Sequence, residues 1–167
     1  MSENRVPGVG ERAPSFRATA STGPVALEDF IGRQSVVLYF YPKADTPGCT
    51  REACGFRDAR AEFEKRNVAV IGVSADDVDA QQRFARKYAL PFPLIADPER
   101  AIIDAYGVWG ERTRPDGTKA FGVRRWTFLI DKTGTIRKVY QNVSPDQHAD
   151  EILRDIDALG LAERGEG

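Results

Sequence analysis

The only two cysteines of the chain, Cys49 and Cys54, lie five residues apart in one short stretch. Thr46-Pro47, just before them, predicts a helix start, because a hydroxyl residue is a favoured N-cap and proline is favoured at the first helical position. Cys49 would then lie in the first turn, where unpaired N–H groups and the helix dipole stabilise a thiolate. Since a free thiol titrates near pH ~8.5 and the thiolate is the nucleophile, we expect Cys49 to be the reactive cysteine.

The spacing of the two cysteines predicts a redox switch. In an intact helix, residues five apart have Cα atoms about 8.6 Å apart and point about 140° apart. A disulfide needs Cα atoms within roughly 7 Å, so Cys49 and Cys54 can bond only if the first turns unwind. A pair of small, buried core cysteines is the ordinary alternative. A structural zinc site is not expected, because two cysteines and the distant His148 do not supply four ligands.

The residues around Cys49 resemble a known family. Pro42-x-x-x-Thr46-x-x-Cys49 is similar to the peroxiredoxin active-site motif. The segment from Cys49 to Cys54 resembles the bacterioferritin-comigratory-protein (PrxQ-like) subgroup, whose second cysteine lies five residues on in the same helix. The resemblance covers about residues 8–159. It implies an atypical 2-Cys thiol peroxidase on an α/β, thioredoxin-like fold, with a central mixed β-sheet flanked by helices and an N-terminal β-hairpin.

A second segment carries the resemblance further along the chain. Residues 124–131 are similar to the family's Arg-Ser/Thr-x-Phe-Leu-Ile-Asp strand, and aligning them on Phe-Leu-Ile-Asp makes Arg125 the active-site arginine. Trp126 stands where the family commonly has a small hydroxyl residue. Because side chains alternate along a strand, Arg125, Thr127 and Leu129 are expected on one face.

The resemblance implies a mechanism in which each of these residues has a role. The Cys49 thiolate attacks the O–O bond of hydrogen peroxide or a small organic hydroperoxide, and Arg125 holds the thiolate and the peroxide oxygens. Thr46 orients the peroxide, and Pro42 shields the thiolate. Cys54 then converts the Cys49 sulfenic acid into a disulfide, which thioredoxin or a similar dithiol protein reduces. No metal, haem, flavin or other cofactor is needed, and the family suggests a monomer or weak homodimer.

Two other functions remain open for such a cysteine pair. A thiol–disulfide oxidoreductase that acts on proteins would exchange disulfides and consume little peroxide. A redox sensor or binding module would be oxidised slowly and almost stoichiometrically. Pro42 and Thr46 around Cys49 argue against the oxidoreductase.

The composition is that of an ordinary globular protein. With 167 residues, 41% of them hydrophobic and 29% charged, the chain is expected to form a single domain over residues 1–167. Its net charge of −1 gives no sign of binding to nucleic acid or to an anionic membrane. The chain has no run of about 18 apolar residues, and its first 14 residues are polar, so neither a membrane span nor a signal peptide is expected. These features favour a cytoplasmic location.

The apolar patterns predict strands alternating with helices, which is typical of a parallel α/β core. We expect, in chain order, a small hairpin around residues 21–24, a strand at 35–41, a helix at 47–66, a strand at 68–75, a helix from 76 or 77 to 88, a short strand within 90–96, a helix at 97–106, a loop-like segment at 107–122, antiparallel strands at 123–131 and 136–143, and a helix at 146–159.

Three further side chains are ambiguous in the sequence. Glu52 is either an exposed charge or a residue that orders its neighbours. His148 is expected at the surface of the last helix, and a Cys–His hydrolase has no evident orienting partner for it. Trp109 is expected to pack in the core or on the surface rather than over the active site.

Overall fold

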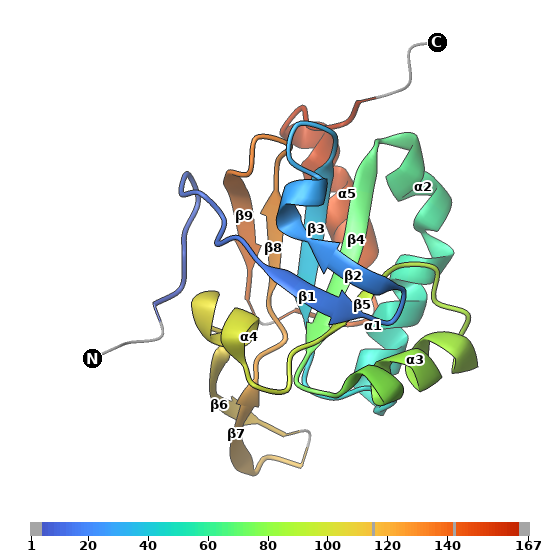
Figure 1. The fold of residues 1–167 in the computed structure, drawn as a ribbon, viewed down its shortest axis with the longest axis vertical. Helices are drawn as coiled ribbons and strands as arrows, with labels where there is room; N and C mark the ends of the chain where they lie inside the picture. Colours follow the sequence, from blue (N-terminus) through green and yellow to red (C-terminus); the bar gives the residue numbers. More distant parts are fainter. Residues whose placement is uncertain (1–4, 115, 142, 164–167) are drawn as a thin grey trace.

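A central sheet of seven strands organises the molecule (Figure 1). The computed structural model describes residues 5–114, 116–141 and 143–163, so residues 1–4 of the predicted polar arm lie outside the described part. Across the sheet the strand order is β2-β1-β5-β4-β3-β8-β9. The strands are β1 (Arg17–Ala20), β2 (Gly23–Ala26), β3 (Ser35–Phe40), β4 (Val68–Ser74), β5 (Leu94–Ala96), β8 (Thr127–Ile130) and β9 (Ile136–Tyr140).

The sheet is mixed, as expected from the sequence. Strands β3, β4 and β5 run parallel, whereas β8 pairs antiparallel with both β3 and β9. The N-terminal hairpin β1–β2 joins the sheet antiparallel to β5. Strand β3 lies inside the sheet, between β4 and β8, and all six of its residues are buried, which explains its continuous apolar run.

Helices cover the sheet on both faces. They are α1 (Pro47–Asp58), α2 (Arg60–Lys65), α3 (Val78–Lys87), α4 (Ala101–Ala105) and α5 (His148–Ala158), with a short 3₁₀ turn at Leu27–Asp29. Alternate residues of β3 point to the two faces. Val37 and Tyr39 pack with side chains from α1, α2, α3 and α5. Val36, Leu38 and Phe40 pack with α4 and the N-terminal segment. No helix of the described residues is long and apolar enough to cross a membrane.

The predicted helix over residues 47–66 is in fact two helices. The backbone at Ala59 has φ −93° and ψ 8°, which ends α1, and α2 begins at the next residue. Phe56 and Phe63 lie seven residues apart, yet their ring centroids are only 5.8 Å apart. Both aromatic rings therefore pack in the same part of the core, one from each helix.

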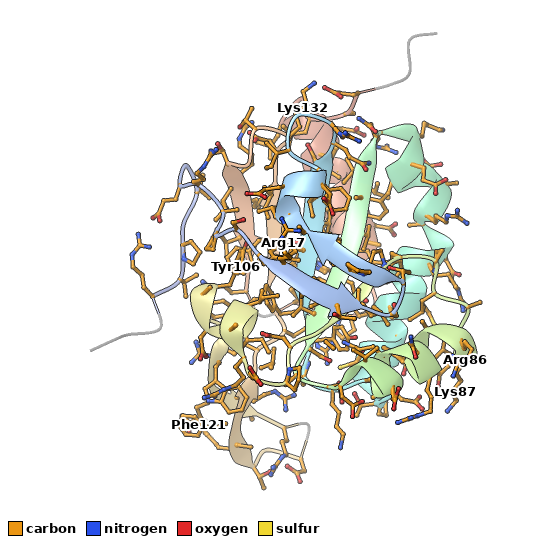
Figure 2. The ribbon with its side chains drawn as sticks, in the orientation of Figure 1. Arg17, Arg86, Lys87, Tyr106, Phe121 and Lys132 are labelled. Atoms are coloured by element: carbon orange, nitrogen blue, oxygen red, sulfur yellow. The ribbon has the colours of Figure 1, made fainter. Side chains whose placement is uncertain are left out.

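The segment expected to be loop-like, residues 107–122, contains a second, two-stranded sheet, β6 (Trp109–Thr113) and β7 (Lys119–Val123). The hairpin projects from the body at the bottom of the view in Figure 1. Phe121 on β7 is 70% exposed and points away from the core (Figure 2). Because these strands pair only with each other and are largely exposed, they lack the apolar pattern that would have predicted them.

Several predicted boundaries were wrong. The expected strand at 123–131 is divided, because Val123 ends β7 and β8 begins at Thr127. Helix α4 begins at Ala101 rather than at residue 97, and the Asp97 carboxylate accepts hydrogen bonds from two N–H groups in its first turn. Strand β9 ends at Tyr140; of the residues expected beyond it, residue 142 lies outside the described part. Helix α5 begins at His148 rather than at residue 146.

Candidate active site

The first turn of α1 carries Cys49 as its third residue. Thr46 is the N-cap with an extended backbone, and Pro47 occupies the first helical position, as expected. The predicted side-chain cap is wrong, however. The Thr46 hydroxyl donates to the Lys43 carbonyl at 2.8 Å and does not accept a bond from the helix. The Thr46 side chain therefore leaves the first-turn N–H groups uncapped at the end where Cys49 lies.

Arg125 reaches Cys49 from the segment that leads into β8. Its Nη2 atom donates to Cys49 Sγ at 3.3 Å, and its Nη1 atom donates to Glu52 Oε1 at 2.8 Å. Antiparallel pairing of β8 with β3 brings this segment beside the end of the strand that leads to α1. The guanidinium therefore places a positive charge and an N–H donor against the sulfur of Cys49.

Glu52 is buried and 1% exposed, so the expectation of an exposed charge is excluded and its ordering role remains. It lies one helical turn after Cys49, on the same side of α1, which is the signal that could have placed it in the site. Burial raises the pKa of Glu52 to about 7, against the lowering effect of the Arg125 charge. Within the described residues, Glu52 Oε2 has no hydrogen-bond partner.

Gly48 lets the guanidinium approach the helix start. A Cβ atom at this position would lie 3.0 Å from Arg125 Nη2, which is closer than ordinary van der Waals contact. A larger residue at position 48 would therefore push Arg125 away from Cys49.

The loop between β3 and α1 is held by the segments that flank α3. The Ala44 N–H donates to Asp76 at 2.8 Å. The Asp45 carboxylate accepts hydrogen bonds from Lys87 Nζ at 2.9 Å and from the Tyr88 hydroxyl at 2.8 Å. Lys87 is the last residue of α3 and is labelled in Figure 2. Pro42 is half-buried in the same loop. These contacts fix the backbone that leads into the first turn of α1.

Cys54 lies further along α1 and is half-buried. Both cysteines are free, and α1 is continuous from residue 47 to residue 58. This is the state in which the helical geometry forbids a bond between them.

His148 is not a surface residue, as the sequence suggested, but is 1% exposed. Its ring nitrogens contact Thr127 Oγ1 at 2.8 Å and Glu151 Oε1 at 3.2 Å. The signal was present in the sequence: His148, Ile152 and Ile156 recur every four residues, and all three are buried on one face of α5.

This arrangement gives no support to a structural zinc site. Both nitrogens of His148 are already within hydrogen-bond distance of protein oxygens. Over residues 5–114, 116–141 and 143–163, no group of three or more His, Cys, Asp or Glu side chains is arranged to hold a metal ion.

Arg125 also lines a cavity of about 590 Å³ beside the β6–β7 hairpin. Arg112, Lys119 and Arg124 contribute further positive charge to its wall, and Trp126 contributes an aromatic surface. Through this cavity, solvent reaches the segment that carries Arg125.

Trp109 is half-buried, packs against the core and lies under the Arg100 guanidinium at 4.0 Å, in agreement with its expected packing role.

The chain is similar to known proteins of one family. Residues 9–139 match the AhpC/TSA family model. The chain is 44% identical over 145 residues to the putative peroxiredoxin bcp of Coxiella burnetii, covering 87% of this chain and 95% of the relative. It is 42% identical over 145 residues to peroxiredoxin Bcp of Escherichia coli K12, covering 86% and 92%.

Solved structures give the same answer for the fold. Peroxidoxin BcpB of Mycobacterium tuberculosis matches with a TM-score of 0.80 and 35% identity, over 91% of this chain and 97% of that one. The bacterioferritin comigratory protein of Xanthomonas campestris matches with a TM-score of 0.79 and 32% identity, over 86% and 91%. The chain therefore belongs to the AhpC/TSA family, in its bacterioferritin-comigratory-protein (PrxQ-like) subgroup of thioredoxin-fold peroxiredoxins.

Proposed function

We propose that this thiol peroxidase uses Cys49 as the peroxide-reacting cysteine and Cys54 as the resolving cysteine. The observation that carries the proposal is the 3.3 Å contact between Arg125 and the sulfur of a cysteine in the first turn of α1. The start of α1 and the guanidinium of Arg125 both favour the thiolate of Cys49, which is the form that attacks peroxide. The X. campestris relative is described as having alkyl peroxide reduction activity, which supports hydrogen peroxide and organic hydroperoxides as substrates.

In the first step, the Cys49 thiolate attacks one oxygen of the hydroperoxide and the O–O bond breaks. The sulfur becomes a sulfenic acid, and the leaving oxygen takes a proton and departs as water or alcohol. Arg125 stabilises the charge that develops on the oxygens. The Thr46 hydroxyl hydrogen is committed to the Lys43 carbonyl, so Thr46 Oγ1 would accept a hydrogen bond from the peroxide. Pro42 shields the thiolate from solvent.

In the second step, the first turns of α1 unwind and the Cys54 thiol attacks the sulfenic sulfur. An S–S bond forms and water leaves. Thioredoxin or a similar dithiol protein then reduces the disulfide by thiol–disulfide exchange and becomes oxidised itself. Neither step requires a metal or an organic cofactor.

The test is a peroxide-consumption assay coupled to thioredoxin and thioredoxin reductase, together with mass spectrometry of the peroxide-treated protein. We expect rapid, catalytic turnover and a Cys49–Cys54 disulfide. Cys49→Ser should abolish turnover. Cys54→Ser should still react rapidly with one equivalent of peroxide but should no longer be recycled by thioredoxin.

The assay also separates the alternatives. Near-stoichiometric, slow oxidation would indicate a redox sensor, and disulfide exchange with little peroxide consumption would indicate an oxidoreductase acting on proteins. If Cys54→Ser loses the fast reaction with peroxide and Cys49→Ser keeps it, the roles of the two cysteines are reversed.

A further inference from the structure

His148 is a buried, titratable side chain that has no part in the peroxide chemistry described above. It is the first residue of α5, far along the chain from Cys49, and it is 1% exposed. A histidine at this depth needs a partner for each ring nitrogen, because an unpaired polar group costs free energy when buried. Both partners are present, so the side chain is held in one orientation.

The two hydrogen bonds indicate which ring nitrogen of His148 carries the proton. A neutral imidazole has one donor and one acceptor. With Nδ1–H donating to the Glu151 carboxylate, Nε2 accepts the hydroxyl hydrogen of Thr127. Burial lowers the pKa of His148 and outweighs the raising effect of the Glu151 carboxylate, so the neutral form that this arrangement requires is favoured.

His148 also touches the helix that carries the reactive thiol. Its ring meets that of Phe56 edge-on, with centroids 5.7 Å apart, and that of Tyr140 at 5.2 Å. Phe56 lies two helical turns after Cys49 on α1. Thr127 lies two residues after Arg125, is fully buried and opens β8. The His148 ring therefore contacts both α1, which carries Cys49, and β8, which follows Arg125.

We propose that His148 is a positioning residue for the Arg125–Cys49 contact. The hydrogen bond to Thr127 fixes the start of β8, and the packing against Phe56 fixes α1. The two elements therefore keep the relative placement that brings Arg125 Nη2 to 3.3 Å from Cys49 Sγ. An apolar ring at this position would fill the space but would leave the Thr127 hydroxyl without this partner. A shift of about 1 Å in such a site is enough to weaken it strongly.

The test compares His148→Phe with His148→Gln, both in reduced protein. Phenylalanine keeps the ring packing and loses both hydrogen bonds, whereas glutamine keeps a polar atom near the position of Nε2. We expect His148→Phe to lower the second-order rate constant for peroxide about tenfold and to shift the ultraviolet thiolate titration, recorded in the Cys54→Ser background, to higher pH. His148→Gln should restore most of both.

Thr127→Val is the second variant, because it removes the hydroxyl at nearly constant volume and tests the same bond from the other side. It should reproduce the effect of His148→Phe, and the double variant should add little to either single change. Ile156→Val is the matched control: Ile156 lies on the same face of α5, eight residues after His148, and is fully buried. It should lower the melting temperature without changing the titration or the rate.

The proposal is overturned if folded His148→Phe and Thr127→Val keep the wild-type titration and rate, or if Ile156→Val changes them equally. The kinetic measurement rests on the proposed function, but the thiolate titration does not. A wild-type protein that fails to consume peroxide would therefore refute the proposed function and still leave the positioning role to be decided by titration.

Discussion

The guanidinium of Arg125 divides its hydrogen bonds between a sulfur and a carboxylate. Two N–H groups in a rigid plane can bridge Cys49 Sγ and Glu52 Oε1 at the same time, whereas a lysine ammonium is a single flexible donor group. We therefore expect Arg125→Lys to keep the positive charge but to lower the second-order rate constant for peroxide by about 100-fold. Stopped-flow measurement with the reduced protein gives this constant directly.

Arg124→Lys is the matched control for this change. Arg124 neighbours Arg125 in sequence, but its guanidinium lies over the Trp126 ring at 5.2 Å rather than at the sulfur. Its substitution should change the rate by less than about twofold, as is usual for surface positions away from the chemistry. Equal losses in the two variants would mean that the loss in Arg125→Lys does not come from the contact between Arg125 and the sulfur.

Glu52 should make the stability of the protein depend on pH. Its pKa is about 7 in the folded state and 4.5 in a solvent-exposed chain. Between these values the folded state keeps a proton that the unfolded chain releases, so stability falls as pH rises through this window. Glu52→Gln does not titrate, so we expect its stability relative to the wild type to rise between about pH 4.5 and pH 7, by about 3 kcal/mol in total.

Urea unfolding of both proteins across pH 4.5–8 measures this difference. His148 titrates in both proteins, so its contribution cancels when the two curves are subtracted. A difference that stays constant with pH would show that Glu52 is not the titrating group, and a difference that shrinks as pH rises would show that its pKa is lowered rather than raised.

At the scale of elements, α1 has to be helical for the first step and partly unwound for the second. Gly55 lies next to Cys54 inside this helix, where glycine is less favourable than alanine by roughly 0.5–1 kcal/mol. Among the described residues, a Cβ at position 55 would meet only the Pro145 carbonyl oxygen, at 4.0 Å, which is an ordinary contact. Gly55→Ala should therefore stabilise the helical state without strain.

We expect Gly55→Ala to slow formation of the Cys49–Cys54 disulfide about two- to fivefold, because the added helix stability must be overcome before the cysteines can meet. Acid quenching and mass spectrometry at a series of times measure this step. The preceding reaction with peroxide should keep its wild-type rate, which is the internal control. Faster disulfide formation in Gly55→Ala would contradict the requirement that α1 unwinds.

At the scale of the whole molecule, one sheet separates two apolar cores. Ile152 is fully buried on the face covered by α1 and α5, whereas Trp109 and Trp126 pack against the core of the opposite face. We propose that both cores belong to a single domain that unfolds cooperatively. Ile152→Ala should cost roughly 2–5 kcal/mol and lower the melting temperature by about 5–15 °C.

The two tryptophans make this prediction testable from the far side of the sheet. Tryptophan fluorescence and far-ultraviolet circular dichroism should report the same shifted transition in Ile152→Ala. A fluorescence transition that stays at the wild-type temperature would show that the two faces unfold independently.

The elements that could be predicted from the sequence are those with a strong local pattern. The buried strand β3, the helix start at Thr46-Pro47 and the hairpin β1–β2 follow from apolar runs, proline and turn residues within a few positions. The β6–β7 hairpin was missed because its residues do not alternate between apolar buried and polar exposed positions; Phe121, for example, is exposed. The break between α1 and α2 was missed because neither proline nor glycine marks it: it falls at Ala59.

The sequence by itself determined which cysteine lies at a helix start and why its partner cannot bond with it in an intact helix. Those are properties of a few consecutive residues and of helical geometry. Only the tertiary structure decided that Arg125 donates to Cys49 and Glu52 together, and that His148 is buried against Thr127. These groups meet because β8 pairs with β3 and α5 packs on α1, and such contacts between distant segments depend on the order of the strands rather than on any local pattern.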